Sequence, residues 1–203
     1  QGHGNVAHPH GILITWATIT EGGVQVNAAG ERFWNEAQGY SEAARAVLSQ
    51  AQGEAYAIFD GRISEIAEQF EDFKRAKSEG AIKSAETLEE LAEDLGLPAD
   101  TLCKTIADIS PNSTDRFGRT FGETVLSPPF CGVRVTGALF HTQGGLKVDT
   151  SARVICKNGS IISNLYAGGG AACGVSGSGD SGYLSGNGLL AAVVLGRIAG
   201  KAS

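Results

Sequence analysis

Apolar and polar residues alternate in short stretches near both ends of the chain, and this alternation predicts β-strands. Two predicted strands, residues 12–20 and 24–27, lie near the N-terminus, and a third covers residues 56–59. The remaining predicted strands cover residues 133–135, 146–148 and 153–155. The sequences Ala-Ala-Gly at residues 28–30 and Lys-Asn-Gly at residues 157–159 predict hairpin turns between neighbouring strands.

The middle of the chain, residues 40–109, has a helical pattern instead. A helix is expected to open directly after Tyr40, and Thr87 with Glu90 forms the Thr-x-x-Glu signal of a second helix start. Pro98 lies in a loop that leads into a third helix. Strands followed by helices and then by strands predict an α+β fold, with a helical insertion between strand-rich flanks.

Glycine is concentrated at the C-terminal end, where eleven of the 29 glycines lie between residues 165 and 203. An apolar segment runs into residues 168–170, all glycine, and a second glycine loop precedes a predicted helix over residues 189–199. A strand, a glycine loop and a helix N-terminus in succession present free backbone N–H groups. Such groups suit a phosphate or the electron-rich edge of a flavin; the alternative is a glycine-rich turn without a ligand.

Composition and charge narrow the choice of partners. The 203 residues are 42% hydrophobic, enough to bury a core in one large domain or two small ones. A formal net charge of −6 without any basic run makes nucleic acid an unexpected partner. Because no apolar stretch is long enough to cross a bilayer and no secretory signal is present, we expect no membrane segment and a cytoplasmic location.

The cysteines give no sign of a metal site. Cys103, Cys131, Cys156 and Cys173 are scattered, without a Cys-x-x-Cys pair or a histidine at ligand spacing, so we expect no bound metal. The chain contains no methionine and begins with Gln1. We therefore expect it to be a piece of something longer or a processed product.

Four segments, spread over nearly the whole chain, resemble a known superfamily. Residues 26–36 read Val-Asn-Ala-Ala-Gly-Glu-Arg-Phe-Trp-Asn-Glu, and residues 142–149 read Thr-Gln-Gly-Gly-Leu-Lys-Val-Asp. Residues 165–169 read Leu-Tyr-Ala-Gly-Gly, and residues 196–200 read Gly-Arg-Ile-Ala-Gly. In this order and spacing they resemble the FAD-dependent fumarate reductase and 3-ketosteroid dehydrogenase superfamily.

The resemblance implies a flavoenzyme in which a cap is inserted into a split, Rossmann-like FAD-binding domain. The family's first part, which carries the Gly-x-Gly-x-x-Gly dinucleotide fold, is absent, so the chain resembles the C-terminal half. Residues 1–34 would be the strand-rich part of the FAD domain, residues 35–131 the α+β cap and residues 132–203 the closing FAD segment. The implied ligands are a small-molecule substrate and FAD, which the chain alone would bind weakly or not at all. The missing part is either truncated or a separate N-terminal FAD-binding polypeptide.

Departures from the family pattern bear on the substrate. Fumarate reductases carry a proton-donating arginine where this chain has Tyr40, and an arginine that clamps a carboxylate near Tyr183. Phe140 stands in place of an expected histidine, and Trp16 and Ile19 stand where a glutamate and an arginine would relay protons. Without both arginines, the chain lacks the groups that best recognise a dicarboxylate.

A tyrosine four residues after Glu36 instead resembles 3-ketosteroid dehydrogenases, in which it acts as a base. A phenol with an unperturbed pKa of about 10 needs a hydrogen-bond partner or a positive field for that role. Tyr183 would donate to a substrate carbonyl, with the Gly186 N–H as a second donor. The alternative for Tyr40 is a half-buried tyrosine at a helix start.

The resemblance thus implies a set of site residues. The predicted catalytic residues are Tyr40, His141 and Tyr183, and the predicted substrate contacts are these three together with His8 and Gly186. The predicted cofactor contacts all lie in the closing FAD segment: Gly144, Gly145, Gly168, Gly169, Gly170, Ser185, Gly186, Asn187, Gly188, Leu189 and Leu190.

Three functions remain open at this point. The first is an FAD-dependent oxidoreductase, similar to ketosteroid dehydrogenases, that moves a hydride and a proton across a carbon–carbon bond. The second is an enzyme similar to fumarate reductase or tricarballylate dehydrogenase that has re-sited its carboxylate clamp, for example to Arg45 or Arg134. The third is a non-catalytic interaction module derived from a flavoprotein.

Overall fold

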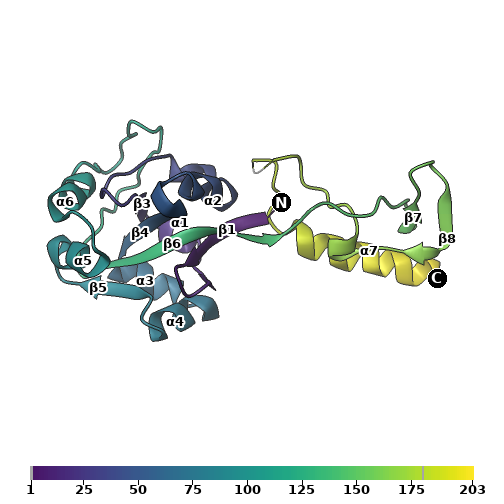
Figure 1. Cartoon of the computed structure of the whole chain (residues 1–203), viewed down its shortest axis with the longest axis horizontal. Coiled ribbons are helices and arrows are strands. Elements are labelled where there is room, and N and C mark those ends of the chain that lie inside the picture. The colour runs from purple at the N-terminus through teal and green to yellow at the C-terminus, as the bar shows by residue number, and fades with distance from the viewer. Residues whose placement is uncertain (1, 180) are drawn as a thin grey trace. The chain divides into compact units, whose positions relative to one another are not determined.

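A sheet of six strands organises residues 4–138 of the computed structural model, which describes residues 2–179 and 181–203 (Figure 1). The strand order is β2-β1-β6-β4-β3, and β5 also pairs with β6. The strands are β1 (Gly2–Ala7), β2 (Ile12–Leu13), β3 (Val24–Val26), β4 (Glu54–Asp60), β5 (Ile82–Ala85) and β6 (Phe130–His141). The long strand β6 pairs antiparallel with β4 along the whole of β4, so these two strands form the middle of the sheet.

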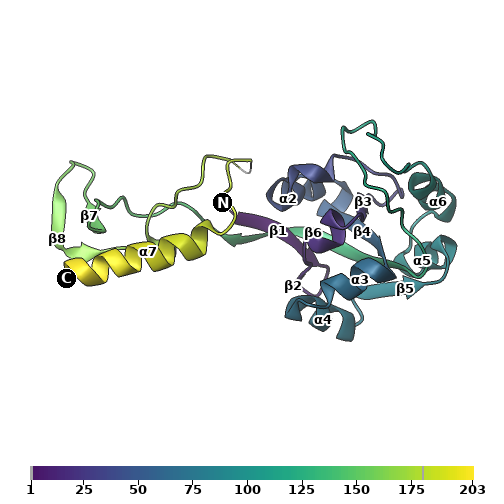
Figure 2. The ribbon, with the colours of Figure 1, turned by 180° about the vertical axis from the view of Figure 1, so that it is seen from behind.

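The pleat of β4 divides the core of this unit between two faces of the sheet. Ala55, Ala57 and Phe59 pack into one buried cluster, whereas Tyr56 and Ile58 pack into a second, as the two-residue period of a strand requires. The first cluster is covered by α2 (Tyr40–Leu48), α3 (Gly61–Ala67) and α4 (Glu71–Ser78), and the second by α5 (Leu88–Leu95) and α6 (Ala99–Ala107) (Figures 1 and 2). Helices therefore shield both faces of the sheet.

Local signals predicted the starts of α2, α5 and α6 to within a residue or two, whereas no start was predicted for α1 (Ala17–Thr20), α3 or α4. The capping box of α5 is present, since Thr87 Oγ1 accepts from the Glu90 N–H (3.2 Å) and the Glu90 carboxylate accepts from the Thr87 N–H (3.3 Å). The predicted strand over residues 12–20 is wrong beyond Leu13, because Ala17–Thr20 form the short helix α1. The Thr15 carbonyl accepts from the Thr18 hydroxyl at 2.9 Å and holds that turn.

The remaining residues, 139–203 with 1–3, form a second unit. It contains β7 (Arg153–Ile155), β8 (Ile161–Tyr166), the 3-10 turn η3 (Gly169–Ala171) and α7 (Asn187–Ala202). The predicted turn at residues 157–159 is confirmed between β7 and β8. The strand expected at residues 146–148 is reduced to two isolated bridges, one to Ala172 and one to Val154.

The second unit has a small core and a long exposed helix. Its core cluster consists of Val154, Ala167 and Ala172, whereas Leu189 and Val193 on α7 are 78% and 70% exposed. Over the described residues, no helix combines the length and apolar character that crossing a bilayer requires. The chain is therefore of mixed α/β type, and it divides between residues 138 and 139, whereas we expected boundaries after residues 34 and 131.

Candidate functional site

The second unit brings two of the predicted catalytic residues together. His141 ends β6, and its Nε2 lies 3.0 Å from the hydroxyl oxygen of Tyr183. The two rings meet edge to face, with centroids 5.4 Å apart. Gly188, in the first turn of α7, lies beside the imidazole, because a Cβ there would come within 3.6 Å of His141 Cε1. Residues 42 positions apart in the sequence thus form one polar group at the start of α7.

A glutamine and an asparagine hold this group in place. Gln143 Nε2 lies 2.8 Å from Nδ1 of His141, and the Gly174 N–H donates to the backbone carbonyl of Gln143 at 2.8 Å. Asn187 is buried, and its side chain accepts from the Val175 N–H (3.1 Å) and donates to the Ser176 hydroxyl (3.1 Å). The predicted role of Asn187 as a cofactor contact is therefore limited to its backbone, since its side chain ties the glycine loop to α7.

The backbone at the start of α7 is accessible to a ligand. Gly186 occupies the N-cap position with a φ of 78°, and none of the described side chains caps the helix. The positive end of this 16-residue helix thus faces outward at the site. A Cβ added at Gly144, Gly170 or Gly186 would meet nothing within 4 Å, so a ligand can approach the backbone there. Ser185, Leu189 and Leu190 are exposed around the same turn.

Other predicted cofactor glycines serve the packing of the chain on itself. A Cβ at Gly145 would lie 2.6 Å from the backbone carbon of Ala172. A Cβ at Gly168 would lie 3.2 Å from Leu195 Cβ on α7. Gly169 has a φ of 55°, a backbone conformation that favours glycine. Close packing at Gly145 and Gly168 and the backbone conformation at Gly169 are sufficient reasons for glycine without any ligand.

Sequence reasoning missed two features of this unit. Gln143 lies inside a motif that we quoted but was not singled out; its position two residues after His141, on the same side of an extended chain, was the available signal. Residues 177–182 also spell Gly-x-Gly-x-x-Gly. The Gly177 N–H donates to the Gly182 carbonyl at 2.7 Å, which closes a tight loop and differs from the strand–turn–helix of a dinucleotide fold.

Tyr40 and His8 belong to the first unit, residues 4–138. Tyr40 is half-buried as the first residue of α2, at the helix start that we predicted. His8 Nε2 lies 3.1 Å from a carboxylate oxygen of Glu54, whose other oxygen lies 2.8 Å from Nε of Arg134. Both His8 and Arg134 are thus engaged with Glu54.

A buried ionic cluster fixes the segment that leads to Tyr40. The Glu36 side chain is fully buried and accepts from the Gln25 N–H (2.9 Å) and from Nε of Arg32 (3.0 Å). Nη1 of Arg119 lies 3.2 Å from Glu36, and Arg32 also pairs with Asp115. Because Glu36 begins the 3-10 turn Glu36–Gln38, directly before α2, this cluster sets the path of the chain into that helix.

In this cluster, burial and ion pairing shift the pKa values of the charged groups in opposite directions. Burial alone would raise the pKa of Asp115, but hydrogen bonds from Arg32 and from the Arg119 N–H hold that pKa below its usual range. Burial likewise opposes the charge of Arg32, yet Glu36 and Asp115 raise the pKa of its guanidinium. Burial lowers the pKa of Arg119, despite the nearby Glu36. Asp115 and Arg32 are thus held in their charged forms at neutral pH, and the cluster has a structural role.

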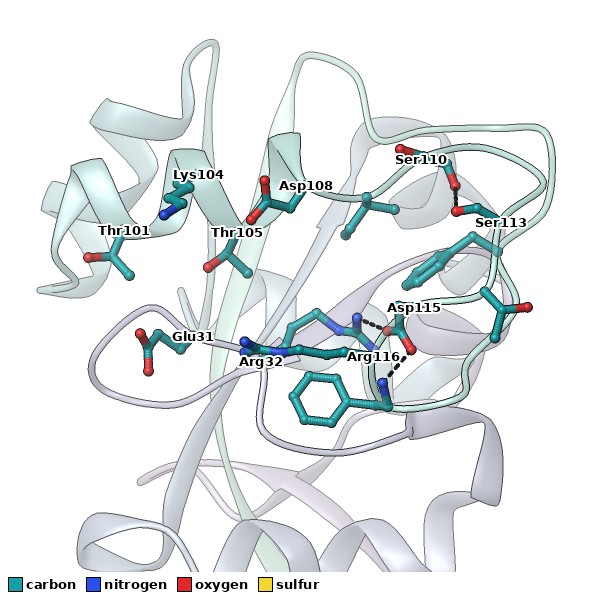
Figure 3. Close-up of a pocket in the computed structure, with 14 residues that line it drawn as sticks. Glu31, Arg32, Thr101, Lys104, Thr105, Asp108, Ser110, Ser113, Asp115 and Arg116 are labelled. Atoms are coloured by element: carbon teal, nitrogen blue, oxygen red, sulfur yellow. Dashed lines mark hydrogen bonds and ion pairs between the residues drawn. The ribbon is translucent and has the colours of Figure 1, made fainter.

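A cavity of about 490 Å³ opens over the same cluster, between α6 and the loop of residues 110–117 (Figure 3). Lys104 and Arg116 line it, but Glu31 and Asp108 balance their charges. Arg32 and its partner Asp115 form part of the wall. None of the predicted site residues lines this cavity, so the candidate site is the group at the start of α7.

The segments that build the candidate site carry no positive side chain. Residues 135–146 and 158–196 contain neither lysine nor arginine. Around His141, Tyr183 and the start of α7, the described hydrogen-bonding groups include an imidazole, a phenol and backbone N–H groups. Such groups recognise a carbonyl oxygen by hydrogen bonding, without the bidentate charge pairing that a guanidinium gives a carboxylate. Over the described residues, no cluster of histidine, cysteine and carboxylate side chains could hold a metal ion.

Comparisons with known proteins find similarity to several oxidoreductases. The chain is 37% identical over 205 residues to the NADH:acrylate oxidoreductase of Vibrio harveyi, a match that covers 95% of this chain and 20% of that protein. It is 30% identical to the probable fumarate reductase Ifc3 of Shewanella frigidimarina, over 98% of this chain and 34% of the relative. It is 28% identical to the 3-oxosteroid 1-dehydrogenase of Mycobacterium tuberculosis, over 76% of this chain and 34% of the relative.

The chain therefore spans about a fifth to a third of the length of these relatives. Among solved structures, the open conformation of a flavocytochrome c3 fumarate reductase superposes with a TM-score of 0.76 and 28% identity, over 100% of this chain and 36% of that one. The open backbone and uncapped helix at Gly186 fit the flavin end of FAD. Residues 3–189 match the FAD binding domain family, and the chain belongs to that family.

Proposed function

We propose that the protein containing this chain is an FAD-dependent oxidoreductase that moves a hydride and a proton across a carbon–carbon bond next to a carbonyl group. The observation that carries this proposal is the hydrogen-bonded pair of His141 and Tyr183 at the uncapped start of α7. In an FAD-binding chain, this pair offers neutral hydrogen-bond donors where a substrate carbonyl oxygen could dock.

Each group has one task in this proposal. FAD, when bound, supplies or accepts the hydride. Tyr183 donates a hydrogen bond to the carbonyl oxygen of the substrate, and a backbone N–H near Gly186 is the second donor. Tyr40 transfers the proton at the neighbouring carbon. Backbone groups around Gly144 and Gly170 contact the flavin, and His8 contacts the substrate from the first unit.

We also propose a domain assignment. Residues 35–131 are the cap that closes over the substrate, and the flanking residues 1–34 and 132–203 belong to a split FAD-binding domain. The exposed apolar face of α7, which includes Leu189 and Val193, supports a missing N-terminal part that covers it. The share of the relatives that this chain spans supports the same assignment.

The proposed substrate class rests on the absence of lysine and arginine from the segments around His141 and Tyr183. The three relatives are named for acrylate, fumarate and a 3-oxosteroid, each with a carbon–carbon bond next to a carbonyl or carboxyl group. A site without arginine favours a single carbonyl acceptor over a dicarboxylate. The fumarate-type alternative needs Arg45 or Arg134 as a new clamp, and Arg134 already pairs with Glu54.

Turnover of the full-length, FAD-loaded protein tests the proposal. Acrylate, fumarate and a 3-ketosteroid should each be supplied with an artificial electron carrier. We expect turnover with a single-carbonyl substrate, and Tyr183→Phe should lower it about 10²–10³-fold, the usual effect of losing one oxyanion donor. Turnover with fumarate alone would favour the re-sited clamp. A colourless protein without turnover on any substrate would favour the interaction module.

A further inference from the structure

The ring of His141 is held from both nitrogens. Nδ1 lies 2.8 Å from the amide nitrogen of Gln143, and Nε2 lies 3.0 Å from the hydroxyl oxygen of Tyr183. An imidazole that is neutral carries one proton, so one of its nitrogens donates and the other accepts. The partner on Nδ1 therefore decides what Nε2 does to Tyr183.

We propose that Gln143 is a positioning residue that fixes His141 with its proton on Nε2, so that Tyr183 presents its own hydroxyl proton to the substrate. The amide N–H₂ of Gln143 only donates, and Nδ1 must accept from it. The imidazole proton then lies on Nε2, which donates to the phenol oxygen. With one hydrogen bond received from His141, the Tyr183 O–H is directed away from the ring.

The opposite amide orientation has the opposite result. If the carbonyl oxygen of Gln143 faced Nδ1, that nitrogen would carry the proton and Nε2 would accept the proton of Tyr183. The phenol would then have no proton to offer to a substrate oxygen. The role of Tyr183 as a donor thus depends on an amide group that need not touch the substrate itself.

Close packing holds the Gln143 amide beside Gly174. A Cβ at position 174 would lie 2.0 Å from Oε1 of Gln143, so only glycine at this position leaves room for the amide as it lies. The Gly174 N–H also donates to the Gln143 carbonyl, and Asn187 anchors the next residue, Val175, to α7. The loop, the helix and the amide are therefore fixed as one assembly.

This inference rests on the proposed function and deepens it, because it explains how a site without lysine or arginine could still stabilise charge on a substrate oxygen. As a hydrogen bond from Tyr183 strengthens in the reaction, negative charge shifts toward the phenol oxygen. The Nε2–H of His141 points at that oxygen and stabilises the charge. Hydrogen-bond donors without a lysine or arginine beside them favour a ketone or a single carboxyl group over a dianion.

Imidazole ¹⁵N NMR on the full-length, FAD-loaded protein tests the proposal directly. The signals of His141 can be assigned by their loss in His141→Gln. We expect a protonated Nε2 and an unprotonated Nδ1. In Gln143→Glu the carboxylate can only accept, so the proton should move to Nδ1, and turnover should fall about 10–100-fold at unchanged FAD content. Gln69→Glu, at an exposed position, introduces the same charge and should change neither readout.

The outcomes separate this inference from the proposed function. A wild-type His141 protonated on Nδ1 would overturn the inference, while a large loss of turnover in Tyr183→Phe would leave the proposed function standing. Protonation on Nε2 with full turnover in Tyr183→Phe would instead remove Tyr183 from the mechanism. The wild-type spectrum decides the tautomer even if Gln143→Glu fails to fold.

Discussion

Two phenols, those of Tyr40 and Tyr183, stand at positions where the resemblance to fumarate reductases leads one to expect arginines. A guanidinium brings a permanent charge and a planar set of donors, whereas a phenol brings one O–H that both donates and accepts. The exchange therefore changes the ligand that the site can recognise more than it changes the fold. The segments around His141 agree with this change, since they contain no lysine or arginine.

Tyr40→Phe in the full-length protein tests the proposed proton transfer. The change removes one hydroxyl from a half-buried side chain at the start of α2, so folding and FAD content should stay nearly unchanged. Turnover should fall about 10²–10⁴-fold, the usual contribution of general acid–base catalysis. Tyr166→Phe is the matched control, because its hydroxyl donates to the Ala202 carbonyl near the end of α7. Undiminished turnover in Tyr40→Phe would shift the assignment to His141 or Tyr183.

The ionic cluster before α2 gives a pH-dependent prediction. Since the pKa of Asp115 is lowered in the folded state, its stabilising effect is fully present above the unfolded pKa of about 4 and is lost as the pH falls through the lower folded value. Asp115→Asn should cost about 1–3 kcal/mol at neutral pH, because it removes a charged partner of the buried Arg32. Urea unfolding should show this difference shrinking below about pH 4.

Asp94→Asn controls for the loss of one negative charge, since Asp94 is exposed on α5. The urea midpoint of Asp94→Asn should match that of the parent protein both at neutral pH and below about pH 4. A difference between Asp115→Asn and the parent that stays constant down to the acid limit would mean that the charge of Asp115 does not stabilise the fold.

The sequence predicted the functional role of a single residue only where that residue lies in or near a family motif. His141 and Tyr183 were found because each lies in or near a segment similar to the family. The ion pair of Arg32 and Asp115 joins positions 83 residues apart, and neither periodicity nor local composition shows such a pair. Gln143 was missed for another reason: its role depends on the distance between its amide and the neighbouring imidazole, which only the fold supplies.

At the scale of elements, local chemistry was a good guide to helices and a weaker one to strands. The helix that begins at Tyr40 and the capping box at Thr87 were predicted correctly, because caps and periodicity are local. Strand β5 was not predicted: its existence depends on pairing with β6 nearly 50 residues later in the chain. The segment Ala17–Thr20 is rich in β-branched residues, yet it forms a helical turn.

Two neighbouring glycines show that a sequence motif alone does not give the role of each of its residues. Gly144 and Gly145 are neighbours in one motif, and we predicted both as cofactor contacts. Position 144 has no atom within 4 Å of an added Cβ, whereas position 145 meets the backbone of Ala172 at 2.6 Å. One is open to a ligand, and the other is required for the bridge between Leu146 and Ala172.

These two neighbours form a matched pair for mutation. Gly145→Ala should destabilise the second unit by about 1–3 kcal/mol, since the methyl group overpacks a backbone contact that cannot yield easily. Gly144→Ala should leave stability nearly unchanged and should instead lower FAD affinity if the flavin approaches this backbone. Thermal unfolding and flavin content, measured on both variants, separate the two effects. Equal melting temperatures would contradict the packing role assigned to Gly145.

At the scale of the whole molecule, the two units differ in how well they bury apolar surface. The first unit has two clusters, one on each face of its sheet. The second unit buries only a few small apolar side chains, while α7 exposes Leu189, Leu190, Val193 and Val194. Exposed apolar surface of this kind marks a contact with another segment or partner. The relatives are three to five times longer than the match, so the proposed N-terminal part of the FAD domain is a natural cover.

We therefore expect the 203-residue chain alone to bind FAD weakly or not at all, because it offers backbone donors for the flavin end and no dinucleotide fold for the ADP end. Titration of FAD, followed by quenching of its fluorescence, measures this directly. Affinity should return when the remainder of the protein is present. Val193→Asp should then weaken FAD retention, because a charge would lie in the contact that covers α7.

The exposed Val125, on a loop of the first unit, provides the control for Val193→Asp. Val125→Asp adds the same charge at a similar type of side chain and should leave FAD retention unchanged. Tight FAD binding by the isolated chain would show that residues 1–203 hold the whole cofactor. In that case a different partner would have to cover the apolar face of α7, and the assignment of a split FAD-binding domain would be wrong.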